Sequence, residues 1–400
     1  MAIDNKDKKV LNVPHLRFPE FSGEWEEHTL SEYLEFKNGL NPDAKRIGSG
    51  LPFISVMDIL SEGVINYDNI RGKVNATEKE IECFGVKDGD LLFQRSSETL
   101  EDVGRANVYM DNRTAIYGGF VIRGRKIGNY DPLFFKYLLA TPLARKRTCR
   151  MGAGAQHFNI GQEGLSKISL YFPSIEEQRK IAEFLSLIDE RIATQNKIIE
   201  KLETLIKGII ELAFNHTATS NTLGCYITQI SQRNKISRDL PVLSVSNKHG
   251  FVEQSEQFED RIIASDDTSN YKMVSINDFA FNPARINVGS IARLKDKECG
   301  IVSPMYICFR TLKDILPEYL ELFFKTFTFS SEVRKRLEGR VRLCLSYESL
   351  CEIVIPVISI KEQQSLVKMV TAFYSKLEVE KGFLRSYQLQ KQYLLSQMLI

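Results

Sequence analysis

Two groups of polar side chains follow short apolar runs and are of the types that read bases. A guanidinium can donate two parallel hydrogen bonds to guanine, and a carboxamide can exchange two with adenine, both in the major groove of DNA. After Asp90–Phe93 come Gln94, Arg95, Ser96 and Ser97, with Arg105 further on; after Asp278–Phe281 come Asn282, Arg285 and Asn287. These two loops are candidate base-reading loops, weighed against the commoner alternative of a polar loop that only faces solvent.

Two clusters of cations are candidate phosphate contacts. The stretch from Val121 to Arg150 contains a single acid, Asp131, and a net charge of +2 means that any nucleic-acid surface on this chain is local. Cations that neutralise phosphates release counterions and add affinity without sequence information. The candidates are Arg145, Lys146 and Arg147 in the first half and Arg334, Lys335, Arg336, Arg340 and Arg342 in the second. The alternative is a solvated helix face.

A search for catalytic chemistry finds no complete motif. Gly152-Ala153-Gly154 lacks the third glycine of a dinucleotide loop, and the chain contains neither a G-x-x-x-x-G-K-[ST] phosphate loop nor a G-x-S-x-G elbow. The seven cysteines form no C-x-x-C pair and the five histidines no H-x-x-x-H pair. We therefore expect no catalytic residue, no metal site and no cofactor of the chain's own, and we expect reduced thiols.

The chain repeats itself. Leu51-Pro52-Phe53-Ile54-Ser55-Val56 returns as Leu240-Pro241-Val242-Leu243-Ser244-Val245, and Ser174-Ile175-Glu176-Glu177-Gln178 returns as Ser359-Ile360-Lys361-Glu362-Gln363. Val103-Gly104 and the region of Pro132 return between these landmarks, in the same order and at nearly the same offset. Each half reads as short strands and turns with one helical piece, near Pro132–Ala144 in the first half.

A long helix follows each half. Ser174 with Glu177, and Ser359 with Glu362, form S-x-x-E capping boxes at the two helix starts. Apolar residues then recur every four and three positions, which favours a coiled coil over a helix lying on its own domain. The first seam is Ile181, Leu185, Ile188, Ile192, Gln195, Ile199, Leu202, Ile206, Ile209 and Ala213; the second is Leu366, Val370, Phe373, Leu377, Glu380, Leu384, Tyr387, Lys391, Leu394 and Met398.

These patterns predict an α+β chain with a pseudo-twofold internal repeat. Two similar mixed α/β recognition domains are separated by two long helices that pair antiparallel as a coiled coil. The expected divisions are an N-terminal segment at 1–20, a first domain at 21–173, a central helix at 174–215, a second domain at 216–358 and a C-terminal helix at 359–400. The first residues lack the apolar region that a secretory signal peptide contains, and no stretch is apolar enough to span a membrane. We therefore expect a cytoplasmic chain without membrane contact.

The chain resembles the specificity subunits of type I restriction–modification systems over nearly its whole length. Four stretches carry the likeness. They are Leu16-Arg17-Phe18-Pro19-Glu20-Phe21 with Gly23-Glu24-Trp25; Gly89-Asp90-Leu91-Leu92-Phe93; Gly154-Ala155-Gln156-His157-Phe158-Asn159-Ile160, running into Phe172-Pro173-Ser174-Ile175-Glu176-Glu177-Gln178 with Ile181-Ala182; and the shorter echo Ser359–Gln363. The second half departs from the pattern, because Arg340-Val341-Arg342 follows Gly339 where a Gln or Asn is expected.

The resemblance implies a subunit without catalytic activity of its own that binds double-stranded DNA. Gln156, within the most specific stretch, joins the expected DNA contacts. The partners implied are two methyltransferase subunits and, through them, endonuclease and translocase subunits; S-adenosylmethionine, ATP and Mg²⁺ would be used by those partners. The alternative from another class is a coiled-coil assembly adaptor with two modules that do not bind DNA. A fused methyltransferase–nuclease lacks every motif it would need.

Overall fold

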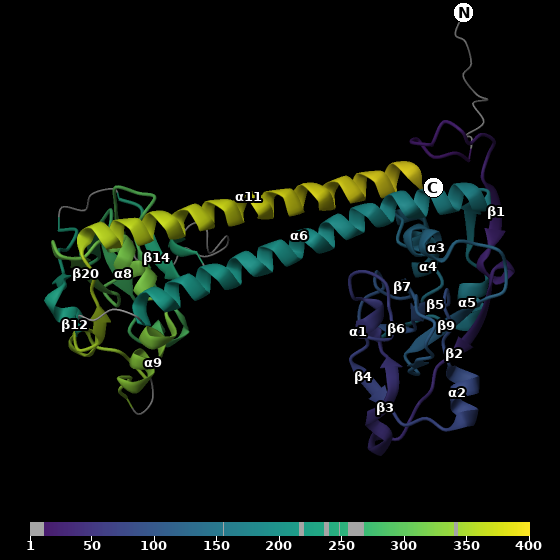
Figure 1. Ribbon diagram of the computed structural model, residues 1–400, viewed down its shortest axis with the longest axis horizontal. Helices are drawn as coiled ribbons and strands as arrows, with labels where there is room; N and C mark the ends of the chain where they lie inside the picture. Colours follow the sequence, from purple (N-terminus) through teal and green to yellow (C-terminus); the bar gives the residue numbers. More distant parts are fainter. Residues whose placement is uncertain are drawn as a thin grey trace, which may run out of the picture. The chain divides into compact units, whose positions relative to one another are not determined.

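The structure is a computed structural model that describes residues 12–154, 156–215, 220–235, 240–247, 249–254, 268–339 and 343–400. The chain forms two compact units (Figure 1). The first comprises Met1–Asn196 with Gly382–Ile400, and the second comprises Lys197–Lys381. Across the described ranges, none of the helices combines the length and the apolar character needed to cross a membrane.

The strands of the first unit form two main sheets and two short ribbons. The larger sheet has the order β2-β9-β5-β7 and is antiparallel, and the smaller sheet β4-β3-β8 pairs β3 with β8 in parallel. The strands are β1 Glu26–Thr29, β2 Leu34–Asn38, β3 Ile47–Ile54, β4 Gly72–Val74, β5 Leu91–Gln94, β6 Ser96–Ser97, β7 Ala106–Val108, β8 Ile116–Tyr117, β9 Val121–Lys126, β10 Phe158–Asn159 and β11 Ser169–Phe172. The ribbons join β1 to β11 and β6 to β10.

The helices of the first unit are short. They are η1 Leu30–Glu32, η2 Ala44–Arg46, α1 Val56–Ile59, α2 Glu78–Phe84, α3 Pro132–Leu139, α4 Pro142–Cys149 and α5 Gln162–Ser166. The prediction of a single helical piece near Pro132–Ala144 is therefore wrong, because two helices, α3 and α4, cover this region. Thr141 has extended backbone angles and caps α4, and Pro142 at the first position of α4 cannot continue the hydrogen bonding of α3.

The second unit repeats the strand order of the first. Its sheet β13-β20-β17-β18 is antiparallel like β2-β9-β5-β7, and its sheet β15-β14-β19-β16 again contains one parallel pair, β14 with β19. The strands are β12 Ser220–Thr222, β13 Ile227–Ile230, β14 Val242–Ser246, β15 Gly250–Glu253, β16 Lys272–Ser275, β17 Phe279–Phe281, β18 Ile291–Arg293, β19 Cys299–Val302, β20 Ile307–Thr311 and β21 Val354–Pro356. The helices are η3 Leu223–Cys225, η4 Ile286–Val288, α8 Pro317–Phe323, α9 Phe327–Lys335 and α10 Tyr347–Cys351.

An ion pair between a buried aspartate and an arginine recurs at the start of the central strand of each unit. Asp90 precedes β5 and lies 3.0 Å from Nε of Arg125, and Asp278 precedes β17 and lies 2.9 Å from Nη2 of Arg310. Each carboxylate also accepts a hydrogen bond from a backbone N–H three residues earlier, at Lys87 and Ser275. Both aspartates are almost fully buried, so breaking either pair would leave an uncompensated charge in the interior.

Two long helices carry the predicted seams. α6 runs over Ile175–Asn215 and α11 over Ile360–Met398 (Figure 1). In the first unit Lys391 of α11 lies 2.5 Å from Asp189 of α6, and in the second unit Lys381 lies 3.3 Å from Glu203. The pairs advance along α6, from Asp189 to Glu203, while they go back along α11, from Lys391 to Lys381, which confirms the antiparallel pairing.

The buried face of α6 shifts near its C-terminal end. Ile181, Leu185 and Ile206 of the predicted seam are buried, but Ile210 and Phe214 are buried in place of Ile209 and Ala213, which are only partly covered. A straight α-helix drifts relative to a strict seven-residue repeat, so its apolar stripe moves by one residue over several turns. Gln195, the one polar position in the first predicted seam, is buried within the first unit.

The two helix starts are capped differently. Ser359 and Glu362 form the predicted reciprocal capping box, with bonds of 3.0 and 3.4 Å. At α6 the Glu177 backbone N–H donates to Ser174 at 3.4 Å, but the Glu177 carboxylate accepts two hydrogen bonds of 2.8 Å from Arg17. The predicted box is therefore only half formed, because a bidentate guanidinium is the stronger partner for that carboxylate.

Candidate nucleic-acid interface

Three segments of the first unit meet beside the end of β5. Backbone hydrogen bonds join Arg95 N–H to Phe120 O at 2.9 Å and Ile160 N–H to Arg95 O at 3.0 Å. The segment before Ile160 is closed by a bridge between Ala153 and Asn159. We call these three segments, Arg95–Arg105, Gly118–Phe120 and the described part of 153–160, the reading edge of the first unit.

Most of the predicted base-reading residues of the first half lie on this edge, but they differ in exposure. Gln94 is only 5% exposed, and its amide donates to Ser96 O at 2.9 Å. Ser96 Oγ donates to Asn159 Oδ1 at 2.5 Å, and Ser97 Oγ accepts from Thr99 N–H at 3.2 Å. Gln94 and Ser97 therefore shape their own segment, while Ser96 joins that segment to Asn159.

The cations and the second amide of this edge are more accessible. Arg95 is half-buried and its Nη1 donates to Gly119 O at 3.3 Å. Arg105 is exposed and pairs with Asp102 at 2.7 Å, while Gln156 is exposed beside His157. Arg95, Arg105 and Gln156 therefore have side chains that DNA can reach without unfolding the edge.

The second unit has an edge of the same construction. Leu345 N–H donates to Pro283 O at 3.1 Å, which corresponds to the bond from Ile160 to Arg95 in the first unit. Glu338 and Cys344 form a bridge that corresponds to the bridge between Ala153 and Asn159. Gly154 and Gly339 both have positive φ at matching places in these bridges. Arg340 and Arg342 fall within the segment that this bridge closes, but they lie outside the described residues.

The loop after β17 carries the other predicted reading residues. Asn282 is 6% exposed and its Oδ1 accepts from Ala284 N–H at 3.1 Å, so it shapes the turn. Arg285 and Asn287 are exposed on either side of Ile286, whose burial anchors the loop. The loop ends at Gly289, whose φ of 92° favours glycine over other residues.

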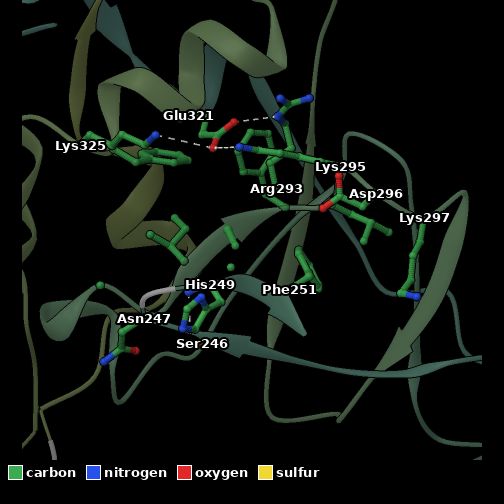
Figure 2. A pocket seen from close by; sticks show the side chains of 17 residues that line it. Ser246, Asn247, His249, Phe251, Arg293, Lys295, Asp296, Lys297, Glu321 and Lys325 are labelled. Atoms are coloured by element: carbon green, nitrogen blue, oxygen red, sulfur yellow. Dashed lines mark hydrogen bonds and ion pairs between the residues drawn. The ribbon is translucent and has the colours of Figure 1, made fainter. Parts of the chain in front are cut away.

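The turn between β14 and β15 lies beside that loop. Ser290 Oγ donates to Val245 O at 3.2 Å, and the exposed Asn247 and His249 belong to this turn. Figure 2 shows both side chains at one end of an open cavity of about 480 Å³, which Gly289 also lines. Asn247 and His249 were not among the predicted contacts, because nothing in the sequence of a hairpin turn indicates which loop it will contact.

The other end of the cavity in Figure 2 is an ion-pair cluster around Glu321. Lys295 Nζ and Arg293 Nε lie 2.5 and 3.0 Å from its oxygens, and Lys325 lies 4.0 Å away. Burial raises the pKa of Glu321, but the bond from Lys295 and the charges of the neighbouring cations outweigh burial and leave the pKa below its usual value. The cluster joins β18 to α8, and the Glu321 carboxylate has its cationic partners within the unit.

The predicted phosphate contacts of the first unit are largely engaged in intramolecular bonds. Arg145 Nη2 donates to the backbone oxygens of Glu101 and Val103 at 2.8 and 2.6 Å, and burial lowers the pKa of this guanidinium. Arg147 pairs with Glu27 at 2.9 Å and lies over the Tyr171 ring. Lys146, between them, is exposed.

The Arg-Lys-Arg triplets of the two units are not equivalent in structure. Arg145 lies one turn after the cap Thr141 of α4, whereas Arg334 lies two turns after the cap Thr326 of α9. Arg334 and Lys335 are exposed, Lys335 pairs with Glu332 at 2.6 Å, and Arg336 binds the same carboxylate. The two triplets therefore occupy different positions in the repeat, and their recurrence does not indicate a shared role.

Within the described ranges, no group of three or more His, Cys, Asp and Glu side chains is arranged to hold a metal ion.

Comparison with known proteins gives consistent matches. Residues 22–204 match the model of the type I restriction modification DNA specificity domain. The chain is 23% identical, over 93% of its length and 92% of the relative's, to the putative type I restriction enzyme MjaX specificity subunit of Methanocaldococcus jannaschii. It is 24% identical, over 46% of its length and 41% of the relative's, to the type I restriction enzyme EcoKI specificity subunit of Escherichia coli.

A solved structure shares the fold. The crystal structure of the S subunit of a type I restriction-modification system from M. genitalium matches with a TM-score of 0.58 at 17% identity, covering 97% of this chain and 99% of that one.

Proposed function

The chain belongs to the family of type I restriction–modification specificity subunits, a family that recognises DNA sequence, and on this premise we propose that each unit reads one half of a bipartite target. The observation that carries the proposal is the repeated edge. In both units a loop leaves the central strand and receives a backbone hydrogen bond from the segment before the long helix, Ile160 to Arg95 and Leu345 to Pro283.

Within each edge we assign the contacts with bases to some residues and the positioning of the loops to others. Arg95, Arg105 and Gln156 in the first unit, and Arg285 and Asn287 in the second, are the proposed base contacts, because each has an accessible fork of donors or acceptors. Gln94, Ser96, Ser97 and Asn282 are bonded to backbone or to Asn159 and position the loops. Lys146, Arg334 and Lys335 are the proposed phosphate contacts.

The long helices are the proposed docking surface for two methyltransferase subunits. Outside the buried seams, α6 and α11 keep large apolar side chains exposed, among them Leu187, Leu205, Leu212, Val379, Phe383 and Leu389. Exposed apolar side chains along one element are a feature of protein–protein contact sites. The chain itself would be non-catalytic, and endonuclease and translocase subunits would join through the methyltransferases. S-adenosylmethionine, ATP and Mg²⁺ would be bound by those partners.

The test is the methylome of cells that carry the chain together with its methyltransferase partner. We expect one motif of two short half-sites around unspecified bases. Purified alone, the chain should neither methylate nor cut DNA, and with its partner it should form a complex containing two partner copies. A contiguous motif, or methylation without the partner, would overturn the proposal. A chain that assembles partners but shows no salt-dependent DNA binding would favour the adaptor alternative.

A further inference from the structure

An exposed apolar surface adjoins the reading edge of the first unit. Phe120 is 68% exposed and Met57 is 72% exposed, and both line an open cavity of about 400 Å³ together with Leu40, Pro42, Ile47 and Phe53. A surface of this kind requires an explanation, because side chains this large gain from being covered. No other described part of the folded unit covers the Phe120 and Met57 side chains.

The backbone holds Phe120 directly against the candidate base-reading loop. Arg95 N–H donates to Phe120 O at 2.9 Å, and Arg95 Nη1 donates to Gly119 O at 3.3 Å. The turn packs closely against Asn41, since a Cβ on Gly119 would lie 1.8 Å from Oδ1 of that side chain. Whatever Arg95 contacts in the major groove will therefore have the Phe120 ring as a near neighbour.

The second unit has an exposed apolar residue at the same place. Strand register pairs Phe93 with Ile122 in the first unit and Phe281 with Ile307 in the second, so that Phe120 and Met305 are equivalent. Met305 is 56% exposed. Two units that differ in their loop residues thus both present a large apolar side chain beside the central strand, a feature that core packing does not require.

We propose that Phe120, supported by Met57, contacts the 5-methyl group of a thymine adjacent to the base that Arg95 reads. This inference rests on the proposed reading role of the first unit. The thymine methyl is the one apolar group that a base pair presents in the major groove, and an aromatic side chain is among its known partners. Phe120 then distinguishes thymine by its methyl, while Arg95 contributes the polar contact.

The test replaces thymine by deoxyuridine, which lacks only the methyl, one position at a time in both strands of the duplex target. The protein is the full chain bound to its methyltransferase partner, and the half-site of the first unit is the one that changes in an Arg95→Ala variant. At one position we expect deoxyuridine to weaken binding by about four-fold, corresponding to about 0.8 kcal/mol for one buried carbon group. Phe120→Ala should bind both duplexes equally.

Ile127→Ala is the matched control. Phe120 and Ile127 flank β9 at its two ends, and Ile127 is 60% exposed, so the change removes a comparable apolar side chain at the other end of the same strand. This variant should keep the full difference between thymine and deoxyuridine. Loss of the difference in both variants would indicate a general effect on the strand and would overturn the proposal.

Failure of this inference is distinguishable from failure of the proposed function. If Arg95→Ala changes one half-site while every thymine can be replaced without effect, or if that half-site has no A·T pair, the methyl contact is wrong and the reading role stands. If Phe120→Ala instead weakens partner assembly and keeps thymine discrimination, the surface binds protein. If Arg95→Ala changes neither half-site, the reading role itself fails.

Discussion

Gln178, in the first turn of α6, accepts a hydrogen bond on its side-chain oxygen from the backbone N–H of Asp131 at 3.1 Å. Its amide donates to Pro173 O at 3.0 Å, so one buried carboxamide joins the start of the long helix to the loop before α3. The second unit repeats the arrangement, with Gln363 accepting from Leu316 at 2.9 Å and donating to Ile358 at 2.9 Å. The recurring S-x-x-E-Q sequence thus fastens each helix to its own domain.

Replacing Gln178 by alanine should destabilise the first unit. The change removes the partner of a partly buried N–H at Asp131 and of a partly buried C=O at Pro173, which costs about 1–3 kcal/mol. Denaturant unfolding should show the loss, and Gln363→Ala should give a similar loss in the second unit. Gln156→Ala is the control, because that glutamine is exposed and its loss should change the free energy of unfolding by less than about 0.5 kcal/mol. Equal effects of Gln178→Ala and Gln156→Ala would contradict the fastening role.

Replacing Arg95 by alanine should alter preference at one base of one half-site. A bidentate contact with guanine is worth about 1–3 kcal/mol of discrimination, so the methylome of the variant should relax at a single position. Arg285→Ala should act in the same way on the other half-site. Relaxation of both half-sites by either variant would show that the two units do not read independently.

Lys146 and Arg145 should behave differently although they are adjacent. Lys146→Ala removes an exposed cation and should reduce the slope of log K against log[salt] by about 0.9, the release of one counterion, for every DNA sequence alike. Arg145→Ala removes the bonds to Glu101 and Val103 and should lower the free energy of unfolding instead. Salt titrations of binding and denaturant unfolding of both variants provide the comparison. A salt slope that changes only in Arg145→Ala would reverse the two roles.

Lengthening α6 should lengthen the unspecified spacer of the target. The helix runs without a break over Ile175–Asn215, and the two units divide within it after Asn196. Four residues inserted beside Gln195 add about 6 Å to this link. At about 3.4 Å per base pair, and with part of the increase absorbed against α11, the spacer should grow by about one or two base pairs.

Both half-site sequences should remain unchanged in that insertion variant, because neither reading edge is altered. Some loss of stability should accompany the change, since four residues interrupt the seven-residue seam. Genome-wide methylation of the variant provides the measurement. An active variant with an unchanged spacer would show that the helix does not determine the spacing.

The chain sequence alone predicted the architecture because the architecture depends on local and periodic signals. The seven-residue seam predicted two long paired helices, and the repeated landmarks predicted two similar α/β units; the strand orders β2-β9-β5-β7 and β13-β20-β17-β18 confirm the repeat. The same signals misplaced details that depend on neighbours distant in sequence. The Glu177 carboxylate binds Arg17 and not the helix start as the capping box predicted. Thr141 and Pro142 divide the predicted helical piece into two helices.

The candidate site was only partly predictable. The loops after the two central strands were predictable, because polar residues that follow an apolar run are visible in the sequence. Which of those side chains is accessible depends on tertiary packing. Gln94 and Asn282 are buried and bond to nearby backbone groups, whereas Phe120, Asn247 and His249 are exposed residues of other turns that lie beside these loops. The exposure of a side chain and the contact between two loops are set by strand register and chain return, which no short stretch of sequence encodes.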